Sequence, residues 1–332
     1  MRRTTGGLLI TASVTAGATL IWYTAPLRAE GEGAKSFTLK EAHDYDFQAT
    51  KSTAKFLGLE GCASASCHGG GTSPQDATKV MNQRATYEKD PHHEAHLGSK
   101  KLRDKAKEIA EKLGLKERPH KSARCLACHA TGGRNFAEDD LPKERQGEKY
   151  SVRDGVSCEA CHGAGEKFVD VHNKANGYAQ AVALGMTPTL DPVIRGNLCL
   201  SCHGKIDAEL VTKGGHPKAE AIVLNVYRRE HQHWPNKTAG AEAKTWAIGQ
   251  VVGLYGNLAT ADKPDGADTG RAQELVKAHQ AALGVFAKAL PSLAGPGNAT
   301  SADADAQYAK LKDATISDTD ARKLAKALLD AA

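Results

Sequence analysis

Cys158-Glu-Ala-Cys161-His162, near the middle of the 332-residue chain, is the pattern that decides the fold. Three further cysteine pairs end in the same Cys-His junction: Cys62-Ala-Ser-Ala-Ser-Cys67-His68, Cys125-Leu-Ala-Cys128-His129 and Cys199-Leu-Ser-Cys202-His203. We number these motifs first to fourth in chain order, so that Cys158 belongs to the third. Together they contain all eight cysteines. The pattern is typical of c-type haem attachment, in which two thiols form thioethers with one porphyrin and the imidazole binds its iron.

The spacing of the motifs suits this chemistry. In Cys-x-x-Cys-His, the first cysteine lies three residues before the second and four before the histidine, so one helical turn presents all three side chains on one face. The first motif has four residues between its cysteines, and we expect the small residues Ala63 to Ser66 to form a bulge there.

Other roles for paired cysteines explain the pattern less well. A Cys-x-x-Cys pair also occurs in zinc half-sites and redox dithiols. Neither requires a histidine after the second cysteine, and a disulfide framework has less regular spacing. We therefore predict four covalently attached haem c groups, with His68, His129, His162 and His203 as proximal iron ligands.

The N-terminus predicts export. Arg2 and Arg3 precede an uncharged, mostly apolar stretch from Gly6 to Tyr23, as in a secretory signal peptide. Haem c matures outside the energy-transducing membrane, which agrees with a periplasmic location. We expect cleavage near Ala25 or Ala29, although the stretch is also just long enough to remain as a membrane anchor.

Composition bears on both the core and the partners. Aromatic residues make up only 5% of the chain, so we expect the haems to supply much of its apolar interior. The formal charge of +5 omits the haem propionates, about eight negative charges on four haems if all are ionised. The holoprotein is then closer to neutral or mildly acidic, and the sequence does not predict nucleic-acid binding.

The fold class we expect is mainly α, with sparse helices packed around four covalent haems and an additional C-terminal helical region. The predicted divisions are a signal peptide at 1–29, a tetrahaem domain at 30–238 and helices at 239–332.

Apolar residues at helical spacing predict four amphipathic helices. Their apolar faces are Leu102, Ala106, Ile109 and Leu113; Trp246, Ile248, Val251, Val252, Leu254 and Leu258; Ala272, Leu275, His279, Leu283 and Phe286; and Ala321, Leu324, Ala327 and Leu328. For the first of these we expect Ser99 as N-cap and Gly114 as the end. We interpret His279 as an ordinary surface or flanking histidine.

The second axial ligands must come mainly from histidine. Beyond Met1, the chain has only Met81 and Met186 for four irons. Ten histidines lie outside the motifs: His43, His92, His93, His96, His120, His172, His216, His231, His233 and His279. Histidine in place of methionine lowers the iron potential, so we expect low-potential haems.

The stretch from Asp154 to Gly165, Asp-Gly-Val-Ser-Cys-Glu-Ala-Cys-His-Gly-Ala-Gly, resembles the tetrahaem cytochrome c554 family around its third haem. The order of features from Phe56 to His203 is also similar, over a little under half of the chain. The resemblance implies that His172 is the distal ligand of the first haem and His92 that of the third. It also implies an open, five-coordinate second haem. His120 lies only five residues before Cys125, which makes closure by that histidine sterically awkward.

The fourth haem has two candidate ligand regions. The resemblance implies a downstream ligand, and the chain offers His216, in Gly214-Gly-His-Pro217, or the pair His231 and His233. We prefer His216, because glycine and proline constrain the backbone that aims its ring.

Three functions remain open for such a chain. The first is an electron carrier between redox proteins, including a membrane-bound donor or acceptor, in nitrogen metabolism. The second is an enzyme acting on nitrite, nitric oxide or hydroxylamine at an open haem. The third is a haem-based gas sensor. The carrier requires the fewest assumptions, and we predict it.

Overall fold

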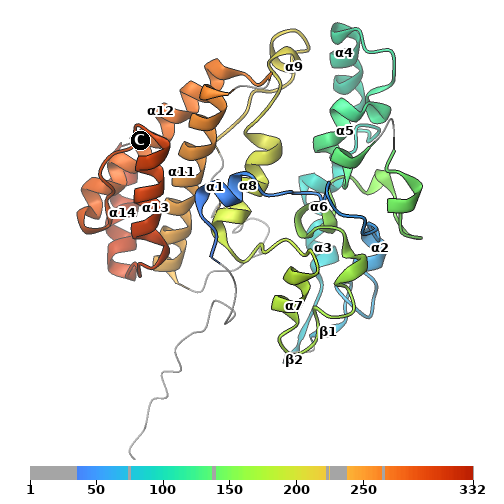
Figure 1. The fold of residues 1–332 in the computed structure, drawn as a ribbon, viewed down its shortest axis with the longest axis horizontal. Helices are drawn as coiled ribbons and strands as arrows, with labels where there is room; N and C mark the ends of the chain where they lie inside the picture. The colour runs from blue at the N-terminus through green and yellow to red at the C-terminus, as the bar shows by residue number, and fades with distance from the viewer. Residues whose placement is uncertain are drawn as a thin grey trace, which may run out of the picture.

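The computed structural model describes residues 36–73, 76–136, 140–221, 224, 238–263 and 266–331. Within these residues the protein is mainly helical, as the sequence predicted. A short antiparallel hairpin of β1 (Thr72–Ser73) and β2 (Asp76–Val80) adds a little extended structure. Figure 1 shows the C-terminal helices on one side of the molecule, α5 (Ala123–His129) and α6 (Cys158–His162) of the second and third motifs on the other, and α8 (Pro192–His203) of the fourth motif between them.

The part before residue 238 is built from short helices joined by long connections. Its α-helices are α1 (Leu39–His43), α2 (Leu59–Cys62), α3 (Gln83–Tyr87), α4 (Arg103–Leu113), α5 (Ala123–His129), α6 (Cys158–His162), α7 (Gly177–Ala183), α8 (Pro192–His203) and α9 (Ala208–Thr212). Single turns of 3-10 helix lie between them: η1 (Pro91–Glu94), η2 (Pro119–Lys121), η3 (Gly133–Asn135), η4 (Lys143–Arg145), η5 (Val152–Asp154) and η6 (Gly165–Lys167).

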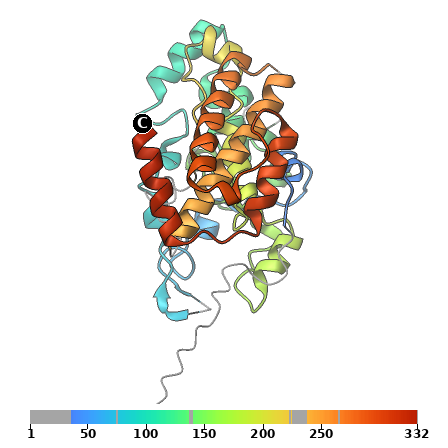
Figure 2. The ribbon, with the colours of Figure 1, turned by 90° about the vertical axis from the view of Figure 1, so that its left-hand side faces the viewer.

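The C-terminal part consists of α11 (Ala239–Asp262), α12 (Thr269–Ala289), η7 (Pro291–Leu293), α13 (Ser301–Lys312) and α14 (Asp318–Ala331). These helices pack side by side, as Figure 2 shows from their own side of the molecule. Thr238 caps α11 by accepting the N–H of Ala241, and Thr300 forms a capping box with Asp303 at the start of α13. None of the helices in the described residues is both long and apolar enough to span a bilayer.

The stripe predicted for α12 is its buried face. Ala272, Leu275, His279, Leu283 and Phe286 are all buried there, which confirms the helical period of the pattern. The interpretation of His279 as a surface or flanking residue was wrong, because only 1% of it is exposed. The ring fits against α11 because Gly253 has no side chain; a Cβ at that position would lie 2.3 Å from His279 Nε2.

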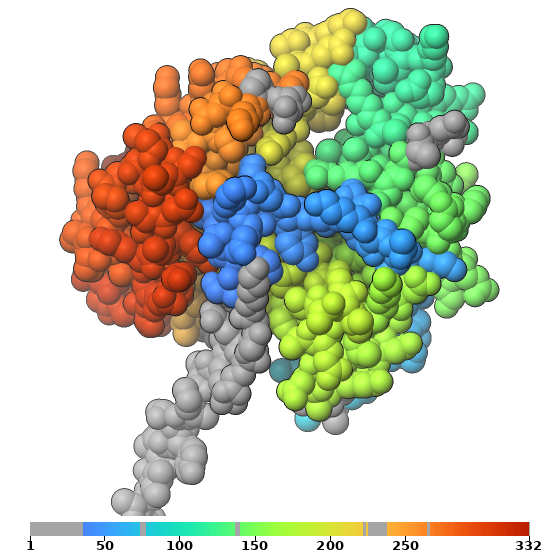
Figure 3. Space-filling model, in the orientation of Figure 1, coloured from blue at the N-terminus to red at the C-terminus, as the bar shows by residue number. Residues whose placement is uncertain are grey.

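The largest hydrophobic core joins the C-terminal helices to two helices from the motif part. Leu39 of α1 and Val193 and Ile194 of α8 are fully buried in it, together with residues of α11, α12, α13 and α14. The segment that carries α1 and α2 crosses the face of the molecule between the two parts (Figure 3). The helix of the fourth motif is therefore packed against the C-terminal helices.

The remaining motif part has only small apolar clusters among its described residues. One contains Ala54, Phe56, Leu126, Ala130, Phe136, Leu141 and Ala164, and another contains Phe168, Ala181 and Met186. A region held by such small clusters is short of apolar contacts for its length. This agrees with the expectation that porphyrins supply part of its interior.

Helix α4 ends as predicted but starts later. Gly114, at φ +70°, terminates it in the left-handed conformation. The predicted N-cap Ser99 belongs instead to a preceding turn, in which its carbonyl accepts the N–H of Arg103. On the exposed face, Glu108 bridges Lys105 and Lys112, so charge pairs within the helix occupy these lysines.

Candidate haem-binding site

Three of the four motifs lie on helices that end at the motif histidine. Helices α5, α6 and α8 have His129, His162 and His203 as their last residues. In α8 the start is fixed by Asp191, whose carboxylate accepts the N–H of Val193 at 2.8 Å. One turn at the end of each helix thus carries both thiols and the imidazole, as the spacing predicted.

The first motif has a different backbone. Helix α2 ends at Cys62, and turns follow, with the N–H of Cys67 bonded to the carbonyl of Ser64 at 2.9 Å. The N–H of His68 then returns to the carbonyl of Cys62 at 3.3 Å. The extra residues therefore form the local bulge that the spacing predicted, and they bring His68 back beside Cys62.

Within the described residues, three motif histidines each face a histidine from another part of the chain. The pairs are His68 with His172, His203 with His92, and His129 with His216. Their ring centroids are 6.0, 6.0 and 6.2 Å apart, and their ring planes are inclined by 24°, 86° and 73°.

This separation fits an iron between the rings. A metal–nitrogen bond of about 2.0 Å on each side, and about 1.1 Å from nitrogen to ring centre, places the centroids of two axial imidazoles roughly 6.2 Å apart. The three pairs therefore have the spacing of bis-histidine haem ligation. Ordinary aromatic pairs also have centroids roughly 4.5 to 7 Å apart, so this spacing supports ligation only together with the hydrogen bonds of the rings.

The hydrogen bonds of the rings also suit metal binding. In five of the six rings, Nδ1 is within hydrogen-bond distance of an oxygen: Gln83 Oε1 for His68 (3.0 Å), Asp90 Oδ1 for His92 (2.9 Å), Ala95 O for His129 (2.9 Å), Val169 O for His172 (2.7 Å) and Pro217 O for His216 (2.8 Å). An Nδ1–H that donates to such an acceptor leaves the Nε2 lone pair for a metal. In these five rings, Nε2 is thus the nitrogen available to bind a metal.

The surroundings favour the neutral form of two motif imidazoles. Burial and the nearby His216 lower the pKa of His129, against the opposing effect of its hydrogen bond to Ala95. Burial and the neighbouring His92 lower the pKa of His203 in the same way. A neutral imidazole is the form that binds iron, so burial and pairing favour the ligating state.

The motifs also contact one another. The Cys62 side chain is hydrogen-bonded to that of Cys158, and the Cys128 side chain to that of Cys202. Together with burial, these contacts raise the pKa of Cys62 and of Cys128. The first motif therefore lies against the third, and the second against the fourth.

Glu159, between the two cysteines of the third motif, reinforces the first of these contacts. Its carboxylate accepts the N–H groups of Leu57, Gly58 and Gly165 at 2.8, 2.7 and 2.7 Å. Burial raises its pKa to about 7 against the opposing effect of these hydrogen bonds. A single buried side chain thus ties the chain before α2 to helix α6.

The stretch before the third motif positions His92. Val156 donates its N–H to the carbonyl of His92 at 3.1 Å. Gly155 precedes it at φ +65°, and a Cβ there would lie 2.8 Å from the same carbonyl. Thr131 closes the arrangement by donating to the carbonyl of Gly155 and accepting the N–H of Ser157. These contacts explain why glycine and small polar residues occupy this stretch.

The structure places the predicted distal ligands opposite three motif histidines. His172 lies opposite His68, the partner that the resemblance implied. His92 lies opposite His203 of the fourth motif, whereas the resemblance implied the third. His216, preferred for the fourth haem, lies opposite His129 of the second. The alternatives His231 and His233 are outside the described residues.

Two other histidines form a pair that the sequence did not predict. The rings of His96 and His120 are 6.1 Å apart and inclined by 54°. Neither belongs to a cysteine motif, and no spacing rule connects them. His93 contacts Tyr87 instead, with centroids 5.1 Å apart.

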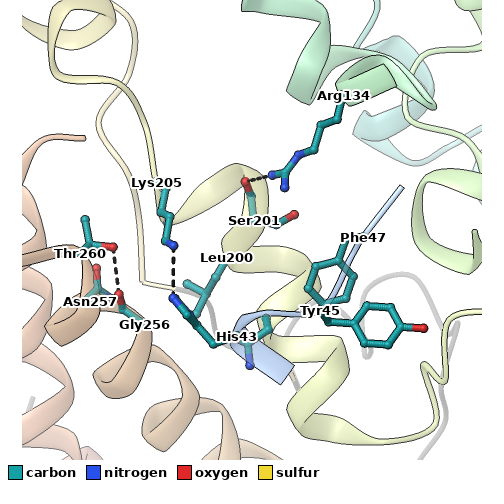
Figure 4. Close-up of a pocket in the computed structure, with 12 residues that line it drawn as sticks. His43, Tyr45, Phe47, Arg134, Leu200, Ser201, Lys205, Gly256, Asn257 and Thr260 are labelled. Atoms are coloured by element: carbon teal, nitrogen blue, oxygen red, sulfur yellow. Dashed lines mark hydrogen bonds between the residues drawn. The ribbon is translucent and has the colours of Figure 1, made fainter. Parts of the chain in front are cut away.

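A small cavity of about 80 Å³ lies beside α8 (Figure 4). Lys205 Nζ is 3.3 Å from His43 Nε2 in its wall, and Arg134 is bonded to the carbonyl of Ser201. This volume is far below the roughly 300 Å³ of a small-molecule pocket. The cavity therefore has room for a few water molecules rather than for an organic substrate.

Helix-borne Cys-Cys-His motifs with opposing histidines define a multihaem c-type cytochrome. Residues 61–163 match the family model described as cytochrome c554 and c-prime, and this match assigns that part of the chain to a c554-type multihaem cytochrome family. The protein is accordingly a c-type cytochrome of electron transfer with covalently bound haem c. No curated protein and no solved structure matches the chain.

Proposed function

We propose that the protein is a periplasmic tetrahaem cytochrome that passes electrons between redox protein partners. The observation that carries this proposal is the pairing of three motif histidines with second histidines at 6.0 to 6.2 Å. Haem c supplies reversible one-electron chemistry at its iron, and two histidine ligands favour low potentials without providing a substrate position.

The number of haems in this proposal is four. Each motif has two thiols and a histidine, and the eight cysteines are free of disulfide bonds. The denatured protein is expected to give a pyridine haemochrome equivalent to four haems, and its mass should exceed that of the mature chain by four haems. A value of three, with Cys62 and Cys67 unmodified, would remove the first motif from the proposal.

The contacts between motifs support a continuous path. Cys62 touches Cys158, which joins the first motif to the third. Cys199 and Cys202 of the fourth motif lie close enough to Cys161 of the third to raise its pKa beyond the effect of burial, and Cys202 touches Cys128 of the second motif. The motifs therefore adjoin in the order first, third, fourth, second. Such an order favours electron entry and exit at the first and second motifs.

Location and partners rest on other observations. Covalent haem attachment and the exported-protein pattern of residues 1–29 support a periplasmic site, although those residues lie outside the described structure. We propose redox proteins as partners, including a membrane-bound donor or acceptor. The mass of the mature chain distinguishes a cleaved signal from a retained anchor. The setting in nitrogen metabolism rests on the family resemblance.

A comparison of electron exchange with substrate turnover tests the carrier against the enzyme. The reduced protein should transfer electrons rapidly to a small redox protein in stopped-flow measurements. Consumption of nitrite, nitric oxide or hydroxylamine, with an electron donor or acceptor supplied, should be slow. Sustained rapid turnover of one of these molecules would overturn the proposal and establish the enzyme instead.

A further inference from the structure

We propose that His216 is the second axial ligand of the iron held by the second motif, so that this iron is closed to exogenous ligands. This inference rests on the proposed tetrahaem function and specifies one of its sites. It departs from the open second haem that the family resemblance implied.

The geometry at His129 carries the proposal. The ring of His216 is the one found opposite His129, with centroids 6.2 Å apart and planes inclined by 73°. His129 Nδ1 is 2.9 Å from the carbonyl of Ala95, and His216 Nδ1 is 2.8 Å from the carbonyl of Pro217. Both Nδ1 atoms have their own acceptors, so both Nε2 atoms remain for one metal between them.

The backbone that presents His216 is held by the end of α9. The N–H of Gly214 bonds to the carbonyl of Glu209 at 3.0 Å, and that of His216 to the carbonyl of Leu210 at 2.9 Å. Gly215, at φ +75°, supplies the left-handed residue that such a helix end requires. The position of His216 is thus fixed by the hydrogen bonds that end the helix.

Packing against α4 holds this turn in place. Gly214 is buried, and a Cβ there would lie 2.6 Å from the carbonyl of Leu210 and 3.0 Å from the side chain of Ile109. Leu113 lies 3.3 Å from the same point. The turn therefore depends on glycine to approach α4 closely enough to reach the second motif.

An ion-pair bridge connects α9 directly to the second motif. Arg124, the residue before Cys125, places Nη2 2.9 Å from Asp207 Oδ1 and 2.9 Å from Glu209 Oε2. The two carboxylates stand at the start of α9, where Asp207 also accepts the N–H of Glu209. The start of α5, which ends at His129, is thereby held to the start of α9, which His216 follows.

The other candidates for this position have different neighbours. His120, five residues before Cys125, faces His96 with ring centroids 6.1 Å apart. His96 Nδ1 lies 3.3 Å from the N–H of Gly98 in its own turn. Among the described histidines, His216 is the one with the spacing of a bis-histidine ligand at His129.

The spin state of the iron tests the proposal on the holoprotein. In wild-type protein, electron paramagnetic resonance and optical spectra should show no high-spin iron from the second motif, and this iron should bind little carbon monoxide in the reduced protein. His216→Ala should convert one further iron to high spin and bind about one carbon monoxide per chain more than wild type. His216→Met should restore a low-spin iron with a higher potential. Carbon monoxide binding by the wild-type protein that is lost when the second haem is removed, as in Cys125→Ala with Cys128→Ala, would overturn the proposal.

Matched variants separate this result from general disruption. His120→Ala should leave the spin states unchanged, whereas conversion of one iron by His120→Ala but not by His216→Ala would assign the position to His120. Arg124→Gln keeps both histidines and should increase carbon monoxide binding by loosening α9, without changing the haem count. A pyridine haemochrome on every sample measures the haem count separately. A count below four would thus refute the tetrahaem function, whereas an altered spin state at a full count bears on His216 alone.

Discussion

The carboxylate of Glu159 accepts the backbone N–H of Gly58 at 2.7 Å, and this bond joins the third haem motif to the chain that enters the first. The same carboxylate accepts two further N–H groups, from Leu57 and Gly165. Because Glu159 is 1% exposed, water does not replace these bonds when the side chain is changed. Glu159, a residue of the third motif, therefore also holds in place the backbone that leads into the first motif.

Replacing Glu159 should lower the free energy of unfolding substantially. Glu159→Gln offers one acceptor oxygen in place of two and leaves at least one buried N–H without a partner. We expect a loss of about 2–4 kcal/mol in the free energy of unfolding, measured by denaturant titration. The control is Glu60→Gln, since Glu60 makes an exposed ion pair with Arg84 and should contribute less than about 1 kcal/mol. Equal losses in the two variants would contradict a special role for Glu159.

His172 should be the distal ligand of the first haem. Its ring is 6.0 Å from that of His68, and its Nδ1 lies 2.7 Å from the carbonyl of Val169. His172→Ala should therefore produce one high-spin iron per chain in the paramagnetic resonance spectrum. His93→Ala is the matched control, because His93 packs against Tyr87, and it should leave all spin states unchanged.

His92 should serve the fourth motif. Its ring lies 6.0 Å from that of His203, so His92→Ala should convert one low-spin iron to high spin. In a background that lacks the fourth haem, such as Cys199→Ala with Cys202→Ala, the same change should leave the remaining three irons as they were. A new high-spin iron in that background would return His92 to the third haem.

His279 should make the stability of the protein depend on pH in the acid range. Burial lowers its pKa from 6.5 to about 4. The unfolded chain then binds the proton more tightly than the folded one between these values. The free energy of unfolding is therefore unaffected by this group above pH 6.5. It falls as the pH is lowered from 6.5 to 4, by about 3 kcal/mol in total.

The measurement is the free energy of unfolding between pH 4 and pH 7. His279→Leu removes the titrating group and should flatten the pH dependence relative to wild type. It also removes the contact of Nδ1 with Gln250 at 2.9 Å, so the comparison concerns the slope and not the absolute stability. Parallel slopes for the two proteins would show that His279 does not titrate as its burial requires.

The fold class and the helical stripes could be predicted from the sequence because both depend on local spacing. The burial of Leu275, Leu283 and Phe286 in α12 followed from period alone. The helical spacing of apolar residues could not show that Gly253 on α11 leaves room for the ring of His279, since that contact depends on how two helices pack. The start of α4 was misplaced for a similar reason, because Ser99 stabilises a turn that precedes the helix.

The histidine pairs could be predicted only in part. The motif pattern fixes one histidine beside each cysteine pair, because that geometry lies within one helical turn. The partner of each comes from a distant segment, and its identity depends on which loops approach which helix. His216 reaches the second motif because Arg124 and α4 hold α9 there, a relationship that no local spacing encodes.

Helix α8 lies in two environments along its length. Its first turns are buried among the C-terminal helices through Val193 and Ile194, and its last turn carries Cys199, Cys202 and His203. Any free energy gained when a haem is attached at that last turn favours the folded form of the whole helix. Haem attachment at the fourth motif and the order of α11, which begins 36 residues after His203, thus belong to a single cooperative unit, and a chain matured without this haem loses stability in a region that contains no cysteine.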